Sequence, residues 1–215
     1  GAPRIDQRPG TLRPMCGRYD LSESPAAIRA HFGVPSVPEF APNPDVRPTQ
    51  RAPIIRLDPR TTGRQSVLVR WGLVPAWAKD LKFGSRCINA RVETVATLPA
   101  FRGAFRSRRC LVPVAAFYEW SGAAGQRTRW RISISGESVF ALAGLWEHWT
   151  NPENGERLDT YTIVTTAANE AIAPLHDRMP VIVPPGRYDG WLDPACTDLS
   201  LFVPVAAKDL KLARQ

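Results

Sequence analysis

The 215-residue sequence lacks the motifs that identify several large classes of enzyme. It contains neither a P-loop nor the glycine pattern of a dinucleotide-binding fold. Its four cysteines form no C-x-x-C pair and have no histidine close by; they are Cys16, Cys87, Cys110 and Cys196. A zinc site needs such clustered ligands. We therefore expect no metal and no cofactor.

A long hydrophobic run is also missing. The longest apolar stretch, residues 139–146, is far too short to cross a membrane. The N-terminal segment does not resemble a secretory signal peptide. These features predict a cytoplasmic protein with no membrane partner, in whose reducing compartment Cys16 stays a free thiol.

Acidic residues are outnumbered, because 28 Lys and Arg face 20 Asp and Glu and give a formal net charge of +8. A basic balance favours polyanionic partners such as nucleic acid, although many proteins are mildly basic. Residues 1–14 are rich in arginine and proline without periodicity. They are expected to be a disordered leader or a cloning remnant ahead of one domain over residues 15–215.

The first helix is the best-defined local element of the sequence. Ser24 is a suitable N-cap, Pro25 fits the first turn and Gly33 ends the segment, which predicts a helix over residues 26–32. The five prolines of residues 34–48 predict an irregular segment.

Short runs rich in Val, Ile and aromatic residues follow, separated by turn signals. The expected strands cover residues 51–57, 66–71, 109–114, 117–120, 129–134, 139–146 and 160–166. Helices are expected at residues 98–105 and 187–192, with a single turn at 169–173. No repeat or linker divides the chain. The pattern predicts one α+β domain with a curved, partly closed antiparallel or mixed β-sheet core flanked by short helices.

The pair Met15-Cys16 carries the most distinctive chemistry. If Met15 is the start and is removed, Cys16 presents a free α-amine and a thiol on one carbon skeleton. The amine can form a Schiff base with an aldehyde, and the thiol can close onto it as a thiazolidine. The open-ring sugar of an abasic site in DNA is one such aldehyde. The alternative is that Cys16 is a small core residue.

Two polar motifs offer further groups for a site. Asn89 and Arg91 stand two residues apart and point the same way if their segment is extended. Arg91 suits a phosphate, and Asn89 can both donate and accept hydrogen bonds. Glu119 lies between aromatic residues at the end of a β run, where a carboxylate can transfer protons near neutral pH. The alternatives are a satisfied polar loop for the first motif and a structural salt bridge for Glu119.

His176 is the one histidine of three that lies in a dense polar turn, beside Asp177 and Arg178. Imidazole suits proton transfer at physiological pH, and the alternative is a loop histidine with no role. Trp71 and Trp77 flank a turn with Gly and Pro. We expect Trp71 in the core and Trp77 exposed, where it can stack on an unpaired base.

Eight motifs in order resemble the SRAP family, the SOS-response-associated peptidases or abasic site processing proteins. The resemblance covers about residues 15–204. The motifs are Met15-Cys16-Gly17-Arg18-Tyr19, Pro48-Thr49-Gln50, Trp71-Gly72-Leu73, Ile88-Asn89-Ala90-Arg91, Glu93-Thr94, Phe117-Tyr118-Glu119-Trp120, Ala143-Gly144-Leu145-Trp146-Glu147 and His176-Asp177-Arg178-Met179-Pro180.

The resemblance implies a monomeric, DNA-associated domain that binds single-stranded DNA and crosslinks to abasic sites by lyase-type chemistry. It implies that Cys16 is the nucleophile and that Asn89 positions the crosslink. Glu119 resembles the acid/base, and His176 the residue that assists ring opening and crosslink reversal. The residues that resemble DNA ligands are Arg18, Pro48, Trp77, Arg91 and Thr165.

Three features depart from the family pattern. Asp45 stands where the family usually has Asn, which puts a carboxylate near the expected DNA path. Val114-Ala115-Ala116 replaces a more polar stretch. The chain diverges from Val205 onward, so that family contacts there are not transferred.

Three functions are therefore to be distinguished. The first is covalent crosslinking at abasic sites in single-stranded DNA. The second is an autopeptidase in which Cys16 and His176 release the segment that ends at Met15. The third is a non-catalytic module that binds single-stranded DNA and is indifferent to the lesion.

Overall fold

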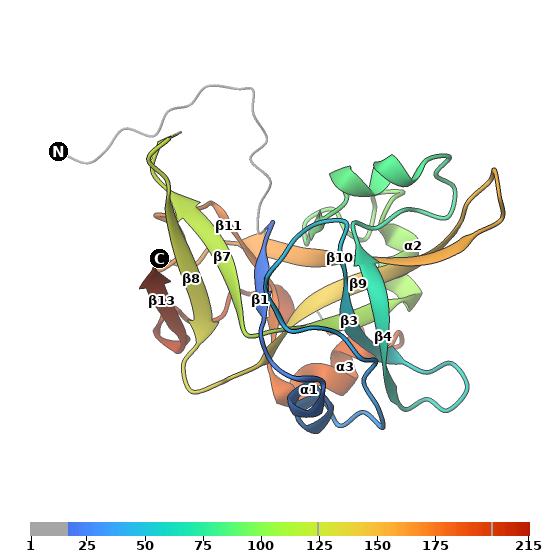
Figure 1. The fold of residues 1–215 in the computed structure, drawn as a ribbon, viewed down its shortest axis with the longest axis horizontal. Coiled ribbons are helices and arrows are strands. Elements are labelled where there is room, and N and C mark those ends of the chain that lie inside the picture. The colour runs from blue at the N-terminus through green and yellow to red at the C-terminus, as the bar shows by residue number, and fades with distance from the viewer. Residues whose placement is uncertain (1–16, 124, 199) are drawn as a thin grey trace.

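The computed structural model describes residues 17–123, 125–198 and 200–215, and Cys16 lies outside them. Strands dominate the described chain (Figure 1). The strands are β1 (Tyr19–Leu21), β2 (Asn43–Val46), β3 (Arg51–Leu57), β4 (Arg64–Trp71), β5 (Asn89–Arg91), β6 (Arg109–Val114), β7 (Ala116–Ser121), β8 (Thr128–Ile134), β9 (Phe140–Thr150), β10 (Arg157–Ala167), β11 (Arg178–Pro180), β12 (Ile182–Val183) and β13 (Leu210–Arg214). The α-helices are α1 (Pro25–Phe32), α2 (Arg102–Ser107) and α3 (Tyr188–Leu192), and the 3₁₀ helix η1 covers Leu81–Arg86.

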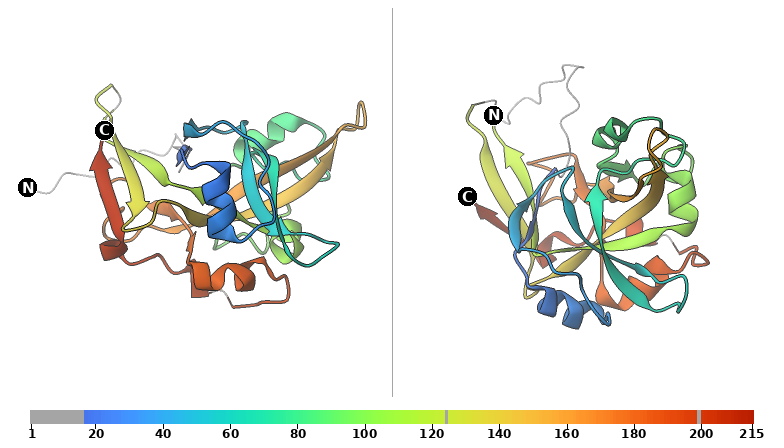
Figure 2. Two further views of the ribbon diagram at one scale, coloured as in Figure 1. Left: turned by 60° about the horizontal axis from the view of Figure 1, so that its bottom comes forward. Right: turned by 45° about the vertical axis from the view of Figure 1, so that its right-hand side comes forward.

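The strands form two sheets. The smaller sheet has the order β13-β8-β7-β1-β2 and is antiparallel, with the C-terminal strand β13 at its outer edge (Figure 2). The larger sheet follows β11-β10-β4-β3-β6-β9-β12, and an additional pairing of β10 with β9 closes five of these strands into a ring. Parallel pairing of β10 with β4 and β5 makes the sheet mixed. The predicted curved, partly closed mixed sheet is thus confirmed.

The two sheets share one core and one continuous segment of chain. Strand β6 of the ring leads into β7 of the smaller sheet through the single residue Ala115. The Ala115 N–H donates to the Asp20 carbonyl oxygen, which ties this crossing to β1. Tyr19 of β1 and Tyr161 of β10 are fully buried, and their hydroxyls lie 2.7 Å apart. Burial of these large rings joins the sheets.

Helix α1 has the ends that the sequence predicts. The Ser24 hydroxyl accepts a hydrogen bond from the Ala27 N–H at 3.2 Å, and Pro25 opens the first turn. Gly33 has φ 62°, the left-handed conformation that ends helices at low cost in glycine. Ile28 and Phe32 stand four residues apart and are both buried, so one face of the helix covers the core.

Two local predictions need correction. The expected helix at residues 98–105 begins only at Arg102 and ends at Ser107. Pro99 disfavours the helical conformation at Leu98 and lacks an N–H, so this stretch forms turns instead. The segment 34–48 is not wholly irregular, because it contains β2. This strand lies at the sheet edge, where its proline is tolerated.

Candidate nucleic-acid site

Asn89, Arg91 and Thr165 are brought together by β5 and β10. The two strands run parallel, with Asn89 opposite Ile163 and Arg91 opposite Thr165. Arg91 is exposed, whereas Thr165 is fully buried and its hydroxyl donates to the Ala90 carbonyl at 3.4 Å. Asn89 and Arg91 lie on an extended segment, which is the condition under which two residues this far apart point the same way.

The side-chain amide of Asn89 is one of three groups of this region that have a buried polar atom without a hydrogen-bond partner among the described residues, together with Thr162 Oγ1 and Arg178 Nε. In Asn89 this atom is Nδ2. A buried donor without a partner costs about 1–3 kcal/mol, so a folded protein retains such a group where it serves another purpose. The amide is thus a candidate donor for a group that comes from outside the described chain.

His176 lies in the turn before β11 and is largely buried. Its Nδ1 atom accepts the Arg178 N–H at 3.0 Å and also lies 2.9 Å from Asp177 Oδ1. The two contacts call for different proton positions on Nδ1. The backbone N–H is fixed by the turn, while the Asp177 side chain is 82% exposed. The Arg178 N–H is therefore the more firmly placed of the two contacts of Nδ1.

Arg178 connects this turn to β5 and β10. Its guanidinium forms a two-pronged ion pair with Glu93, and its Nη2 donates to the Thr165 carbonyl at 2.7 Å. The Arg178 side chain is only 10% exposed. Ion pairing with Arg178 outweighs partial burial and lowers the pKa of Glu93. This ion pair fixes the turn that carries His176 relative to the strand that carries Asn89.

Glu119 lies on the core-facing side of β7 and is 3% exposed. Side chains alternate along a strand, so Glu119 shares a face with Phe117, while Tyr118 and Trp120 share the other. Tyr19 of β1 is directly paired with Phe117. Glu119 therefore projects from the same face of the smaller sheet as the buried Tyr19.

The contact between the sheets joins this face to β10, the strand that pairs with β5. Tyr161, Ile163 and Thr165 share one face of β10, and Ile163 is paired with Asn89. Tyr161 meets Tyr19 at 2.7 Å through the two hydroxyls. The face of β7 that holds Glu119 is thus opposed to the face of β10 and β5 that holds Thr165 and Asn89.

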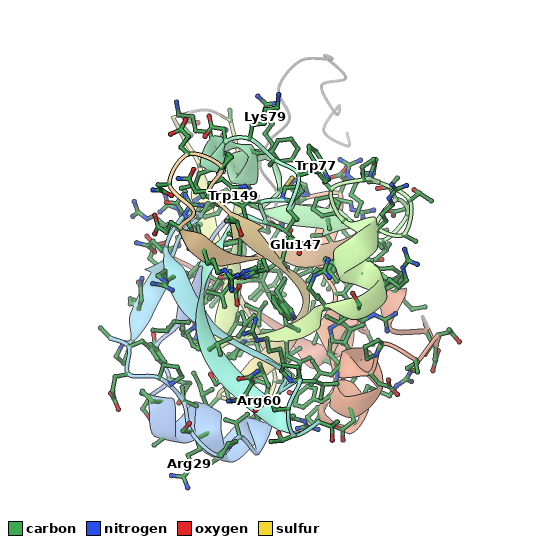
Figure 3. All side chains as sticks on the ribbon, turned by 90° about the vertical axis from the view of Figure 1, so that its right-hand side faces the viewer. Arg29, Arg60, Trp77, Lys79, Glu147 and Trp149 are labelled. Atoms are coloured by element: carbon green, nitrogen blue, oxygen red, sulfur yellow. The ribbon has the colours of Figure 1, made fainter. Side chains whose placement is uncertain are left out.

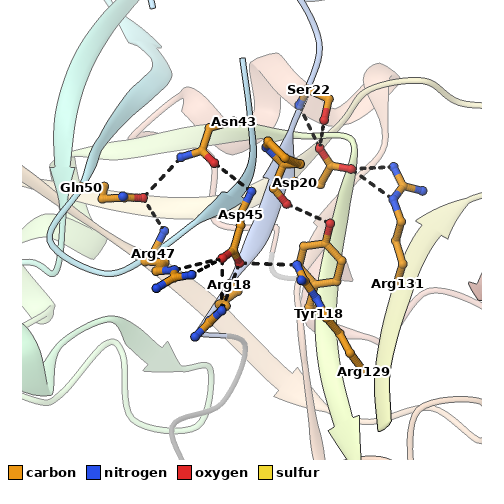
Figure 4. Close-up of polar contacts among 11 residues, drawn as sticks. Arg18, Asp20, Ser22, Asn43, Asp45, Arg47, Gln50, Tyr118, Arg129 and Arg131 are labelled. Atoms are coloured by element: carbon orange, nitrogen blue, oxygen red, sulfur yellow. Dashed lines mark hydrogen bonds and ion pairs between the residues drawn. The ribbon is translucent and has the colours of Figure 1, made fainter. Parts of the chain in front are cut away.

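Arg18, directly before β1, belongs to a charged cluster with Asp45 of β2, Arg47 directly after β2 and Arg129 of β8 (Figure 4). Its Nη1 lies 3.1 Å from Asp45 Oδ2. Arg47 approaches the same oxygen at 2.7 Å, and Arg129 lies 3.4 Å from Oδ1. Partial burial alone would raise the pKa of Asp45, but the hydrogen bond from Arg47 and the three positive charges outweigh it and lower that pKa. The carboxylate stays ionised among its arginines.

Aromatic rings contact two of these arginines through cation–π interactions. The Arg129 guanidinium carbon lies 3.7 Å from the centre of the Tyr118 ring, and that of Arg18 lies 5.7 Å from the Trp120 ring. Contacts of this kind fix a guanidinium in place while its edge stays available. Tyr118 also donates its hydroxyl proton to the Pro44 carbonyl at 2.9 Å, which holds β2 against β7.

Pro48 and Trp77 mark two further parts of the surface. Pro48 is half-buried in the turn between β2 and β3, directly after Arg47. Trp77 is 58% exposed and packs edge to face on Phe83, beside a second small core that contains Trp149 (Figure 3). Trp71 is fully buried, so both predictions for the two tryptophans of this turn are confirmed.

Several contacts of the site were missed from the sequence. The residues Arg129, Tyr118, Trp120 and Arg178 have partners far away in the chain, whereas Arg47 contacts Asp45 only two positions away. Arg129 and Arg131 stand two apart on β8, and they reach past β7 to the carboxylates of Asp45 on β2 and Asp20 on β1. That spacing is the one signal in the sequence that predicts a shared basic face.

Within the described ranges, no group of three or more His, Cys, Asp and Glu is arranged to hold a metal ion. The cysteines at 87 and 110 are buried free thiols, and burial raises the pKa of Cys87 to about 11. None of the helices in the described part of the chain is long and apolar enough to cross a membrane.

Comparison with known proteins identifies the family. Abasic site processing protein YoqW of Bacillus subtilis (strain 168) is 40% identical over 205 residues, which cover 92% of this chain and 90% of that protein. Abasic site processing protein HMCES of Gallus gallus is 28% identical, with 83% of this chain and 66% of that protein covered.

Solved structures share the fold. A protein from Bordetella bronchiseptica is 28% identical and has a TM-score of 0.81, with 93% of this chain and 99% of that chain covered. A protein from Bacteroides thetaiotaomicron has a TM-score of 0.85 at 24% identity, with coverage of 93% and 91%. The family described as SOS response associated peptidase (SRAP) matches residues 15–214. The chain therefore belongs to the SRAP family.

Proposed function

We propose that this protein processes abasic sites by forming a covalent crosslink to them in single-stranded DNA. Its relatives YoqW and HMCES are named abasic site processing proteins. The crosslink is a thiazolidine between the sugar aldehyde and Cys16, once Cys16 is the first residue of the chain. Phosphates of the strand are bound by arginines, which include Arg18 and Arg91.

Formation of the thiazolidine from the sugar aldehyde and Cys16 releases one water molecule. His176 assists the opening of the sugar ring to its aldehyde. The neutral amine of Cys16 attacks the aldehyde carbon, and a useful neutral fraction exists at pH 7 because an α-amine titrates at roughly 8. Glu119 donates a proton to the carbinolamine hydroxyl, which leaves as water, and the Glu119 carboxylate takes up the N–H proton as the imine forms. The thiol then adds to the imine carbon, its proton passes to the nitrogen, and Asn89 donates a hydrogen bond to the product.

One observation carries the proposal: the buried Asn89 amide has no partner among the described residues. It belongs to a face that is opposed to the face of Glu119 through the contact of Tyr19 with Tyr161. Cys16 precedes Arg18 by only two residues in the sequence, and consecutive α-carbons are about 3.8 Å apart. The Arg18 carbonyl accepts the Tyr118 N–H, so this part of the chain meets β7, the strand that holds Glu119.

A crosslinking experiment tests the proposal. Protein that begins at Cys16 is incubated with single-stranded DNA that contains one abasic site, and the products are separated on a denaturing gel. We expect a shifted band that disappears with Cys16→Ser and persists with Cys196→Ser, the matched control. A missing band, or an undiminished band with Cys16→Ser, would refute the thiazolidine.

The family description also names a peptidase, which keeps self-processing as a second candidate. In that function, the Cys16 thiol attacks the carbonyl carbon of Met15, and His176 accepts the thiol proton and passes it to the Cys16 nitrogen as the Met15–Cys16 peptide bond breaks. Water then hydrolyses the resulting thioester and releases the segment that ends at Met15. Intact-mass measurement of the protein with its leader, with and without Cys16→Ala, decides the matter. Cleavage before residue 16 that survives Cys16→Ala would exclude self-processing.

A further inference from the structure

Three guanidinium groups converge on a single carboxylate on the outer side of β1, β2 and β8 (Figure 4). Asp45 accepts contacts from Arg18 at 3.1 Å, Arg47 at 2.7 Å and Arg129 at 3.4 Å. Three positive charges and one negative charge leave this arginine cluster with a net charge of +2. The arrangement is that of an anion-binding site whose anion is a residue of the chain itself.

The arginine cluster is open to solvent in spite of these contacts. The side chains of Arg18, Arg47 and Arg129 are 36%, 55% and 30% exposed, whereas that of Asp45 is 21% exposed. Stacking of Arg129 on Tyr118 holds the cluster in place. A solvent-borne anion can therefore reach the guanidinium edges without unfolding the surface, and it meets the carboxylate among them.

We propose that Asp45 limits the affinity of this surface for the phosphate backbone of single-stranded DNA. The inference rests on the proposed function, since it assigns the arginine cluster to the DNA path. Asp45 occupies the position among the guanidiniums that a phosphate oxygen would take. An incoming phosphate is attracted by a net charge of two instead of three, and its contact with Arg47 competes with the Asp45 carboxylate.

A limit of this kind has a use for a protein that searches for rare lesions. Phosphate contacts carry no information about whether a base is present. Intact nucleotides far outnumber abasic sites, so strong backbone binding would hold the protein on undamaged strands. Binding at the lesion does not need strong phosphate contacts, because the covalent bond to Cys16 retains the protein there.

The test is equilibrium binding to an intact single-stranded oligonucleotide, measured by fluorescence anisotropy at several salt concentrations. We expect Asp45→Asn to bind about three- to tenfold more tightly at about 0.1 M salt. The slope of log Kd against log salt should steepen by up to about one. Asp45→Ser removes the same charge with a shorter side chain, and it should change affinity in the same direction.

The matched control is Asp189→Asn. Asp189 lies on α3, is 83% exposed and pairs with Arg64, so its substitution gives the same change in net charge at another place. We expect this variant to bind less than twofold more tightly than the unsubstituted protein, because attraction by net charge alone is screened.

The outcomes separate this inference from the proposed function. If the unsubstituted protein crosslinks abasic DNA but neither Asp45 variant binds intact DNA more tightly, the inference is wrong and the proposed function stands. If Asp189→Asn tightens binding as much as Asp45→Asn, the effect belongs to net charge and the inference is also wrong. A protein that binds no single-stranded DNA at all would contradict both.

Discussion

The arginine cluster and the region around Asn89 use polar groups in opposite ways. In the arginine cluster, three guanidinium groups surround the Asp45 carboxylate and satisfy it, although the cluster keeps a net charge of +2 and Arg129 Nε has no hydrogen-bond partner among the described residues. Around Asn89, a buried amide nitrogen has no partner among the described residues. The first arrangement satisfies its carboxylate with groups of the folded chain. The second needs a group from elsewhere, and it is the more specific indication of chemistry.

The difference shows why charge alone is a poor guide to a reactive site. Arginines that pair with a carboxylate bind a ligand and position it, and solvent screens much of the binding free energy that they contribute. A buried donor without a partner has already lost its water, so a ligand that reaches it gains a full hydrogen bond. We therefore expect substitutions near Asn89 to change the rate of crosslinking, and substitutions in the arginine cluster to change affinity.

The largest expected effect sharpens this division. In the proposed mechanism the buried Glu119 transfers protons, so Glu119→Gln should lower the rate of crosslinking by about 10²- to 10⁴-fold. Affinity for single-stranded DNA should change by less than about twofold, because Gln keeps the shape of the side chain. Rates from a denaturing gel and affinities from anisotropy measure the two effects. Glu156→Gln, at an exposed position of the β9–β10 hairpin, is the control. If Glu119→Gln lowers rate and affinity together, the expectation that the two regions control rate and affinity separately is wrong.

A smaller effect is expected where the sheets that carry the two regions meet. Burial raises the pKa of both Tyr19 and Tyr161, so both hydroxyls stay protonated and one donates to the other. Tyr19→Phe or Tyr161→Phe leaves a buried hydroxyl without its partner, which should cost about 1–3 kcal/mol in the free energy of unfolding. The double variant should cost less than the sum of the single ones. Urea unfolding measures this coupling, and additive effects would show that the hydroxyls act independently.

The smallest expected effect lies in the arginine cluster and depends on pH. The pKa of Asp45 is lower in the folded protein than its unfolded value of about 3.9. Its stabilisation is thus fully present above that value and is lost as the pH falls through the lowered folded value. Asp45→Asn should reduce the free energy of unfolding by less than about 1 kcal/mol at pH 6, and the difference should shrink below pH 4. Urea unfolding at pH 6, 4 and 3 measures it, and a difference that grows on acidification would contradict the assignment.

Much of the fold was predictable from local signals. Helix α1 has its cap residues in the sequence, and the long strands β3, β6 and β10 carry Val, Ile and aromatic runs. Strands of two or three residues such as β11 and β12 are too short for a periodic pattern, and they form because β10 and β9 offer pairing edges.

The candidate site was predictable in its residue types and less so in its partners. Asn89, Glu119 and His176 were expected as polar groups in apolar or compact surroundings. The contact between Arg129 and Asp45 spans 84 positions of the chain, and only the order of β8, β7, β1 and β2 brings the two together. The sequence marks Asp45 as a carboxylate near the DNA path. It contains no sign that three arginines share it.

The crossing from β6 to β7 has a mechanical consequence. A single residue, Ala115, separates the two strands, and Tyr19 holds the sheets together from β1. There is no linker here about which one sheet could swing as a lid over a bound strand. We expect the protein to be the stiff partner and the nucleic acid to deform. A position without a base has lost its stacking, and it is the place where a strand bends at the least cost.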